Sequence, residues 1–189
     1  ALPASRNGRI LVVMSAAALL FRPELLSKIE ETGGRIIVPT GALIGLDAVK
    51  AAAEGTIHQV KMVSTKPIKS LLAAPFLKEK NLNLEDMVTP TKIFSGNALE
   101  AAIGFPENTN ITAALSLAGI GPEKTLLEIW ADPKTDRNIH TVELKGTETS
   151  FSVTIEGIPS STNAASGLLT PLSLISTLRD LTSPLKVGS

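Results

Sequence analysis

The hydrophobic pattern near the start of the chain predicts two short parallel strands, each followed by a helix. Residues 9–14 and 35–40 are short apolar runs, and we interpret the first as a fully buried strand. Between them, Pro23 suits the first turn of a helix that the glycines at 33–34 end. A second helical pattern covers residues 43–55. Alternating strands and helices with short connections are typical of a Rossmann-like α/β sheet.

After Gly55 the pattern changes and predicts an α+β segment with a mainly antiparallel sheet. Strands are expected at 57–65, 91–96, 125–133, 138–146 and 149–157. Residues 133–137 are expected to join two of them, and a hairpin is expected to turn at Gly146–Thr147. Helices are expected around 70–77, at 97–105 and at 111–119, the last capped by Thr109 or Asn110.

A last amphipathic helix is predicted over residues 167–182, with Pro171 in its first turn. The fold class is therefore α/β plus α+β. We expect a partial Rossmann-like segment at 1–55, an α+β catalytic or dimerisation domain at 56–165, and a C-terminal helix at 166–189 that packs back.

The amino-acid composition limits the kinds of molecule that the protein is expected to bind. The 18 basic and 18 acidic side chains cancel, and aromatic residues make up only 3%, so neither nucleic acid nor a membrane is expected as a partner. The absence of cysteine excludes disulfides and fits a cytoplasmic protein. Arg6 and Arg9 precede an apolar run, Ile10–Phe21, that resembles a signal peptide, but we favour a buried strand there.

The turn at residues 39–48 joins the end of a predicted strand to the start of a helix. Exposed backbone N–H groups at such a turn favour an anionic or carbonyl ligand, although many such turns carry glycine for packing alone. A dinucleotide-binding G-x-G-x-x-G pattern is absent. The segment that comes nearest, GIGPEK at 119–124, lacks the third glycine and precedes a strand.

His140 is one of only two histidines in the chain. Strand alternation places it on one face with Val142 and Leu144. Two interpretations follow: a core histidine hydrogen-bonded to a backbone carbonyl, or an acid–base group. His58 has the pattern of an ordinary strand residue, and no cluster with metal-ligand spacing is present.

Several segments taken together resemble the L-aspartate dehydrogenase family. They are VVMSAAAL (12–19), RIIVPTGALIGLDAVKAAA (35–53), STKP (64–67), FSGNALEAAIGFPENTNITAALSLAGIG (94–121), ADPKTDRNIHTVEL (131–144) and GLLTPLSLISTLRDL (167–181). The resemblance implies NAD- or NADP-dependent oxidation of L-aspartate to iminoaspartate or oxaloacetate and ammonia, linked to pyridine nucleotide biosynthesis. A homodimer is expected on other grounds, because a sheet edge would be left open and symmetric dimers are the commonest oligomers.

The resemblance assigns roles to matching positions. His140 would be the catalytic acid–base residue. Gly41, Ala42 and Asn110 would contact the nicotinamide side of the cofactor. We infer more loosely that Asn138, Thr65 and Lys66 orient or neutralise the substrate carboxylates, although solvent exposure is the commoner use of such lysines.

Two departures from the family pattern keep other hypotheses open. The family begins with a glycine-rich nucleotide-binding half, and this sequence starts after it. At NAASG (163–167) the family usually has Pro, a basic residue and Thr-Ser, so Ala164 and Ala165 would remove a contact. The alternative is a non-catalytic homologue or subunit that acts through the α+β domain as a dimerisation module. A third hypothesis is another small-substrate reductase.

Overall fold

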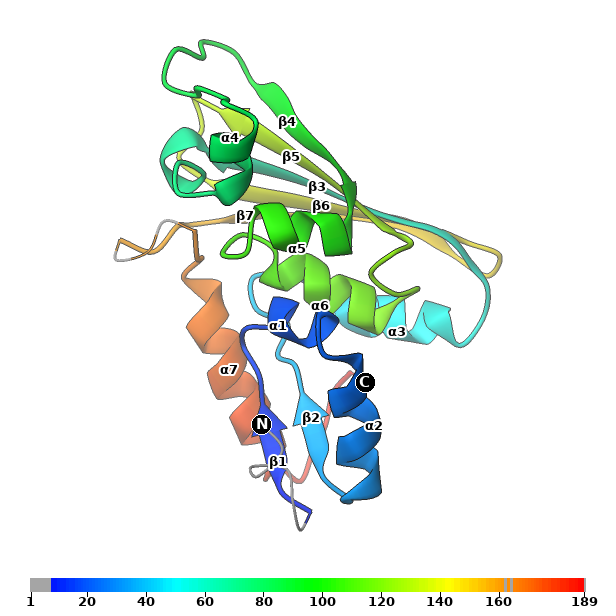
Figure 1. Ribbon diagram of the computed structural model, residues 1–189. Helices are drawn as coiled ribbons and strands as arrows, with labels where there is room; N and C mark the ends of the chain where they lie inside the picture. Colours follow the sequence, from blue (N-terminus) through cyan, green and yellow to red (C-terminus); the bar gives the residue numbers. More distant parts are fainter. Residues whose placement is uncertain (1–7, 162, 164, 189) are drawn as a thin grey trace.

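Two β-sheets of different size organise the chain (Figure 1). The structure is a computed structural model that describes residues 8–161, 163 and 165–188. The smaller sheet pairs β1 (Ile10–Val12) with β2 (Arg35–Ile37). The larger sheet has the order β4-β5-β3-β6-β7. Its strands are β3 (Ile57–Pro67), β4 (Thr91–Asn97), β5 (Thr125–Asp132), β6 (Asn138–Gly146) and β7 (Ser150–Gly157).

The smaller sheet confirms the predicted parallel pairing. Helix α2 (Pro23–Glu31) starts at the predicted proline, and Gly33 follows its end at φ +66°. The prediction that the first strand is fully buried is wrong, because Ile10 is 40% exposed. Among the described residues β1 pairs with β2 alone, which leaves Ile10 without cover from a second strand. The apolar run that starts with β1 continues into a short helix, α1 (Ala17–Leu20).

The larger sheet contains the predicted strands but pairs them in another order. Strands β5 and β6 do not form a hairpin, because β3 lies between them. β3 is parallel to β5 and antiparallel to β6. The hydrophobic pattern of each strand does not specify this order, because β3 pairs with β5 and β6, which follow it much later in the chain. The hairpin of β6 and β7 is confirmed, and Gly146 N–H donates to Thr149 O within its turn.

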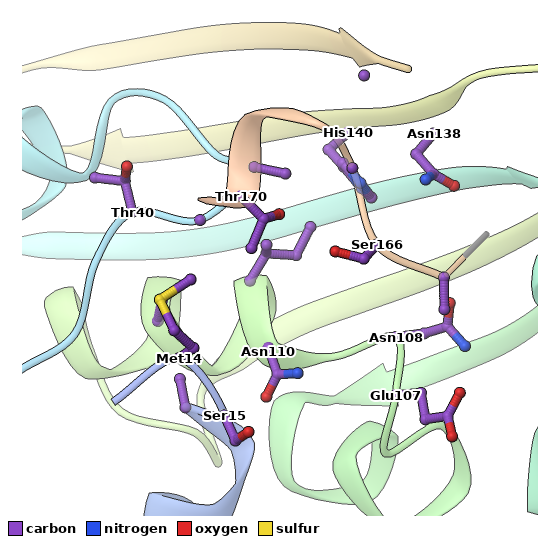
Figure 2. Close-up of a pocket in the computed structure, with 18 of the residues that line it drawn as sticks. Met14, Ser15, Thr40, Glu107, Asn108, Asn110, Asn138, His140, Ser166 and Thr170 are labelled. Carbon is purple, nitrogen blue, oxygen red and sulfur yellow. The ribbon is translucent and has the colours of Figure 1, made fainter. Parts of the chain in front are cut away.

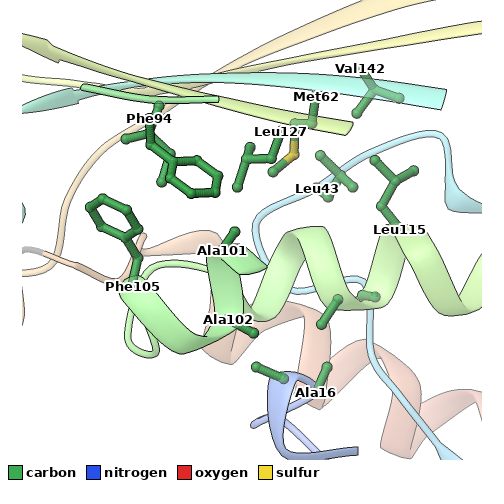
Figure 3. Close-up of a cluster of buried hydrophobic side chains, with 14 of the residues drawn as sticks. Ala16, Leu43, Met62, Phe94, Ala101, Ala102, Phe105, Leu115, Leu127 and Val142 are labelled. Carbon is green, nitrogen blue, oxygen red and sulfur yellow. The ribbon is translucent and has the colours of Figure 1, made fainter. Parts of the chain in front are cut away.

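Helices cover one face of the larger sheet, which we call the inner face. They are α3 (Leu46–Ala53), α4 (Pro75–Glu79), α5 (Ala98–Gly104) and α6 (Asn110–Ala118). The inner face is apolar: Met62, Leu127 and Val142 meet Leu115 of α6 (Figure 3). Three phenylalanines, Phe76, Phe94 and Phe105, pack with ring centroids 5.1–5.4 Å apart.

Local signals set some helix ends and not others. Asn97 and Glu100 form a reciprocal capping box that starts α5. The helix expected around 70–77 is replaced by a 3₁₀ turn, Ile68–Ser70, followed by α4, because Pro75 opens a new helix. Neither Thr109 nor Asn110 caps α6 with its side chain.

Helix α7 (Leu169–Asp180) confirms the last predicted helix, with Pro171 in its first turn. Figure 1 shows α7 beside the smaller sheet. Ser173 is its one buried residue, while Leu172 and Ile175 are exposed. Within the described part of the chain, no helix combines the length and apolarity that a membrane span requires.

Candidate active site

A cavity of about 370 Å³ lies where the two sheets meet. Its walls come from the inner face of β3 and β6, the turn after β2, the start of α6 and the segment that leads into α7 (Figure 2). Six of the seven residues predicted for the site line it: His140, Lys66, Asn138, Gly41, Ala42 and Asn110. Segments far apart in the sequence therefore converge on one cavity.

His140 lies on the cavity wall and is 3% exposed. It stands directly opposite Ser64 in the β3–β6 register, and its Nδ1 lies 2.9 Å from Ser64 Oγ. Burial lowers the pKa of His140 well below its usual 6.5, and the positive charge of Lys66 lowers it further. The ring is therefore neutral at neutral pH, which is the state that a base requires.

Lys66 is the second titratable group of this wall. Alternation along β3 puts it on the same face as Ser64, and it is 2% exposed. Burial lowers its pKa from 10.5 to about 8. No carboxylate of the described residues lies within ion-pair distance of it. The cavity therefore contains an ammonium group that no described carboxylate neutralises, which favours an anionic ligand.

Asn138 completes a group of four polar residues on the inner face. It is 2% exposed and lies two positions before His140 on β6. We call Ser64, Lys66, Asn138 and His140 the polar quartet. Their neighbours farther along both strands are apolar, which makes the quartet a local break in the core.

The turn after β2 forms the opposite wall. Gly41 has φ +65°, a conformation that favours glycine, and its N–H donates to Ser173 Oγ of α7 at 3.1 Å. Ala42 follows, and a Cβ placed on Gly167 would lie 3.5 Å from the Ala42 Cβ. Small residues therefore line this wall and leave room for a flat group.

Asn110 lies at the start of α6. Its Oδ1 accepts from the backbone N–H of Ala17 at 3.2 Å. This contact explains why Asn110 does not cap its own helix. The side-chain oxygen is occupied, so the Nδ2 amide is the group left to donate to a ligand.

Thr65 does not join the other predicted site residues. It lies between Ser64 and Lys66 on β3, so its side chain points to the other face of the sheet. There it is paired in register with Trp130 and Ile139. The geometry gives Thr65 no access to the cavity lining.

The segment 163–167 contributes to the cavity, although Ala164 lies outside the described residues. Ala165, Ser166 and Gly167 line the wall, and Ala165 N–H donates to Asn163 Oδ1. The segment GIGPEK, 119–124, connects α6 to β5, as its position before a strand predicts.

Sequence reasoning missed several lining or supporting residues. Ser64 could have been found from alternation, since it shares a face with Lys66. Asn108 had no such signal. Its Nδ2 donates to Ser70 O at 3.3 Å, and its buried Oδ1 has no partner among the described residues. Further polar residues line the cavity: Ser15, Thr40, Glu107, Asn163, Ser166 and Thr170. The described residues include no cluster of three His, Asp or Glu side chains suited to a metal ion.

The sequence and the fold both have known relatives. Residues 47–181 match the family described as "Aspartate dehydrogenase, C-terminal". The L-aspartate dehydrogenase of Bradyrhizobium diazoefficiens is 50% identical over 99% of this chain, and L-aspartate dehydrogenase 3 of Bordetella bronchiseptica is 48% identical over 99%. The chain spans 66% and 68% of the lengths of these relatives, or about two thirds.

The fold is similar to the crystal structure of aspartate dehydrogenase from Thermotoga maritima. The TM-score is 0.78 at 28% identity, and the match covers 99% of this chain and 72% of that one. The likeness extends over both sheets and therefore over every wall of the cavity.

Proposed function

The chain belongs to the aspartate dehydrogenase family, and from that premise we propose that it acts as an NAD(P)-dependent L-aspartate dehydrogenase. In the proposed reaction L-aspartate is oxidised to iminoaspartate, which water converts to oxaloacetate and ammonia. The observation that carries the proposal is a neutral, buried histidine beside a buried lysine that lacks a counterion, both lining one cavity.

Lys66 suits an anionic substrate. A carboxylate placed beside its ammonium group would restore the charge balance that burial disturbs. We assign to Lys66 the binding of one substrate carboxylate and to the neighbouring Asn138 a part in its orientation. Thr65 has no part in this proposal, because its side chain lies on the other face of the sheet.

His140 suits the proton transfers. When the α-carbon loses a hydride and the C=N bond forms, the amine nitrogen loses a proton, and the neutral ring accepts it. The imidazolium then returns this proton to the imine nitrogen, and the ring, neutral again, assists the attack of water on the imine by taking a proton from that water. In the direction of amination these transfers run backwards, so His140 serves as the acid.

The opposite wall fits the nicotinamide end of a cofactor. The small residues at Gly41, Ala42 and Gly167 admit a planar ring, and the Asn110 amide is available as a donor. When bound, the nicotinamide accepts the hydride from the substrate. The cavity volume of about 370 Å³ lies near the lower end of the range for small-molecule sites, roughly 300–1,000 Å³. That volume suits a small substrate and one ring, and it does not distinguish NAD from NADP.

Substrate discrimination tests this proposal. The protein is expected to reduce NAD⁺ or NADP⁺ with L-aspartate at least about 100-fold more efficiently than with L-asparagine, which has a similar shape but a neutral side chain. Equal rates with both amino acids, or no cofactor reduction with L-aspartate, would overturn the proposal.

We also propose that two copies of the chain form a homodimer, and we retain the cytoplasmic location as a prediction. The support for the dimer is the face of the larger sheet that points away from the helices, which we call the outer face. It carries half-buried Val63, Thr65, Ile139 and Thr141 beside an ion-paired group formed by Lys61, Glu128 and Lys92. A half-buried centre of valine, isoleucine and threonine side chains, with charges of both signs beside it, can pair with an identical surface.

A further inference from the structure

Ser64 and His140 form a buried pair between two strands. They stand directly opposite each other in the antiparallel β3–β6 register, and they are 2% and 3% exposed. The serine hydroxyl lies 2.9 Å from Nδ1 of the ring. Because Nδ1 is turned toward β3, Nε2 is the ring nitrogen left for the cavity, and no described residue forms a hydrogen bond with it.

The charges around the ring come from two elements. Lys66 of β3 and Glu107 of the connection between α5 and α6 line the same cavity. On the inner face the other neighbours of His140 are neutral: Asn138 on its own strand and Ile155, its partner on β7. No described carboxylate contacts Nδ1. The partner that orients this histidine is therefore a neutral hydroxyl.

We propose that Ser64 is the positioning residue of His140. The Ser64 hydroxyl oxygen accepts a hydrogen bond from Nδ1–H of the ring, and this contact presents the Nε2 lone pair of His140 to the substrate. The inference rests on the proposed function, because it takes His140 as the acid–base group. It adds a residue to which the family resemblance assigned no role.

A hydroxyl suits this task because it accepts and donates hydrogen bonds. In the base form, Nδ1–H donates to Ser64 Oγ and Nε2 is free to accept. When Nε2 takes the proton from the amine or from water, Nδ1–H keeps its hydrogen bond to the same oxygen. No proton passes to Ser64, and the ring stays in one orientation throughout.

A carboxylate in the place of Ser64 would act differently. Its negative charge would favour the imidazolium and raise the pKa of the ring. The hydroxyl orients the ring without that effect, so the ring stays neutral until it meets the substrate. The opposite tautomer, in which Ser64 O–H donates to Nδ1, would leave a proton on Nε2 and block its use as a base.

Nitrogen NMR of the two histidine rings tests the pair without any assay of activity. The chain has only His58 and His140, so a His58→Gln variant identifies the signals of each. At neutral pH we expect the His140 ring to carry its proton on Nδ1. In Ser64→Ala we expect a mixture of tautomers, and in Ser64→Thr, which keeps the hydroxyl, the original tautomer.

Kinetics tests the consequence. Ser64→Ala is expected to lower kcat about 10- to 100-fold with little change in KM, and Ser64→Thr to restore most of the loss. In a plot of kcat against pH, the acidic limb should move to lower pH in Ser64→Ala. The imidazolium form of His140 loses a hydrogen-bond acceptor in this variant, so the pKa of the ring falls. A merely structural role would not move this limb.

The outcomes separate the two proposals. A wild-type ring protonated on Nε2, or a Ser64→Ala variant with the wild-type tautomer and pH profile, would overturn the role of Ser64. The expected NMR result without cofactor-linked turnover would support the pair and contradict the proposed function. If Ser64→Ala does not fold, the wild-type and Ser64→Thr spectra still decide the tautomer.

Discussion

At the scale of single residues, the cavity combines two weak bases that burial affects in the same direction. Lys66 and His140 both lose solvation, and the pKa of each is lowered. The results differ because the two groups start from different values. His140 becomes neutral at lower pH than an exposed histidine, while Lys66 keeps its charge up to about pH 8. Between the two pKa values the site has a neutral base and a charged anion receptor.

The pH dependence of activity should reflect this pair. We expect kcat/KM for L-aspartate to rise through an acidic limb below pH 6.5, where His140 loses its proton, and to fall near pH 8, where Lys66 loses its proton in the free enzyme. In Lys66→Met the alkaline limb should disappear, because the group that titrates there is gone. An alkaline limb that persists unchanged in this variant would contradict the role of Lys66.

Lys66→Met should also stabilise the fold while it weakens substrate binding. Below pH 8 the wild-type protein buries a charge without a protein counterion, and an apolar side chain of similar length removes that penalty. We expect the free energy of unfolding at pH 7 to rise by about 1–3 kcal/mol, measured by urea denaturation. The KM for L-aspartate should rise at least about tenfold.

The gain in stability that Lys66→Met provides should become smaller as the pH rises. The folded-state pKa of Lys66, about 8, lies below its ordinary 10.5. Between these values the unfolded state binds more protons, so the wild-type stability rises with pH until the penalty is gone. Lys61→Met is the matched control, since Lys61 lies on the other face of β3 in a 3.2 Å ion pair with Glu128. A gain that is equal at pH 7 and pH 10.5 would contradict this explanation.

At the scale of elements, helix α7 supports the turn after β2, which forms the opposite wall of the cavity. Ser173 accepts from Gly41 N–H and donates to Thr170 O, so one hydroxyl links the turn after β2 to the first turns of α7. The two segments are 132 residues apart. The position of the Gly41–Ala42 turn therefore depends on a helix near the end of the chain.

Ser173→Ala should loosen this turn. We expect a loss of about 1–2 kcal/mol in the free energy of unfolding, because Gly41 N–H loses its acceptor, and a KM for NAD(P)⁺ raised several-fold with a smaller change for L-aspartate. Thr177→Ala is the control, because Thr177 Oγ1 donates only to Ser173 O within the same helix. Equal effects of the two substitutions on the cofactor KM would contradict the link.

The family resemblance predicted most of the lining residues, and strand alternation placed His140 on the apolar face, but neither predicted the order of the strands. His140 was placed beside Val142 because the period of a strand is two residues, and the buried positions of β6 follow that period. Thr65 and Lys66 were grouped because both lie in the STKP segment of the resemblance, yet neighbours on a strand point to opposite faces. Alternation places Ser64 on the face of Lys66, but its contact with His140 depends on the pairing of β3 with β6. That pairing joins segments 76 residues apart, and no local pattern specifies it.

At the scale of the whole molecule, the outer face of the larger sheet predicts how two copies meet. Sedimentation is expected to give twice the mass of one chain. Thr141→Arg should reduce it to the mass of a single chain, because the new charge would lie at the half-buried centre of the face. Val88→Arg, at an exposed position before β4, should leave the dimer intact. A wild-type monomer would contradict the proposed dimer.

The most direct test of the central claim is the oxidation of NADH or NADPH by the protein with oxaloacetate and ammonia, alongside His140→Ala. We expect turnover that requires ammonia and that falls by at least about 100-fold in His140→Ala, since the buried ring supplies the proton transfers. Ammonia-dependent turnover that survives this substitution would contradict the role of His140. No turnover by a folded wild-type protein would contradict the proposed activity itself and leave His140 as a core residue.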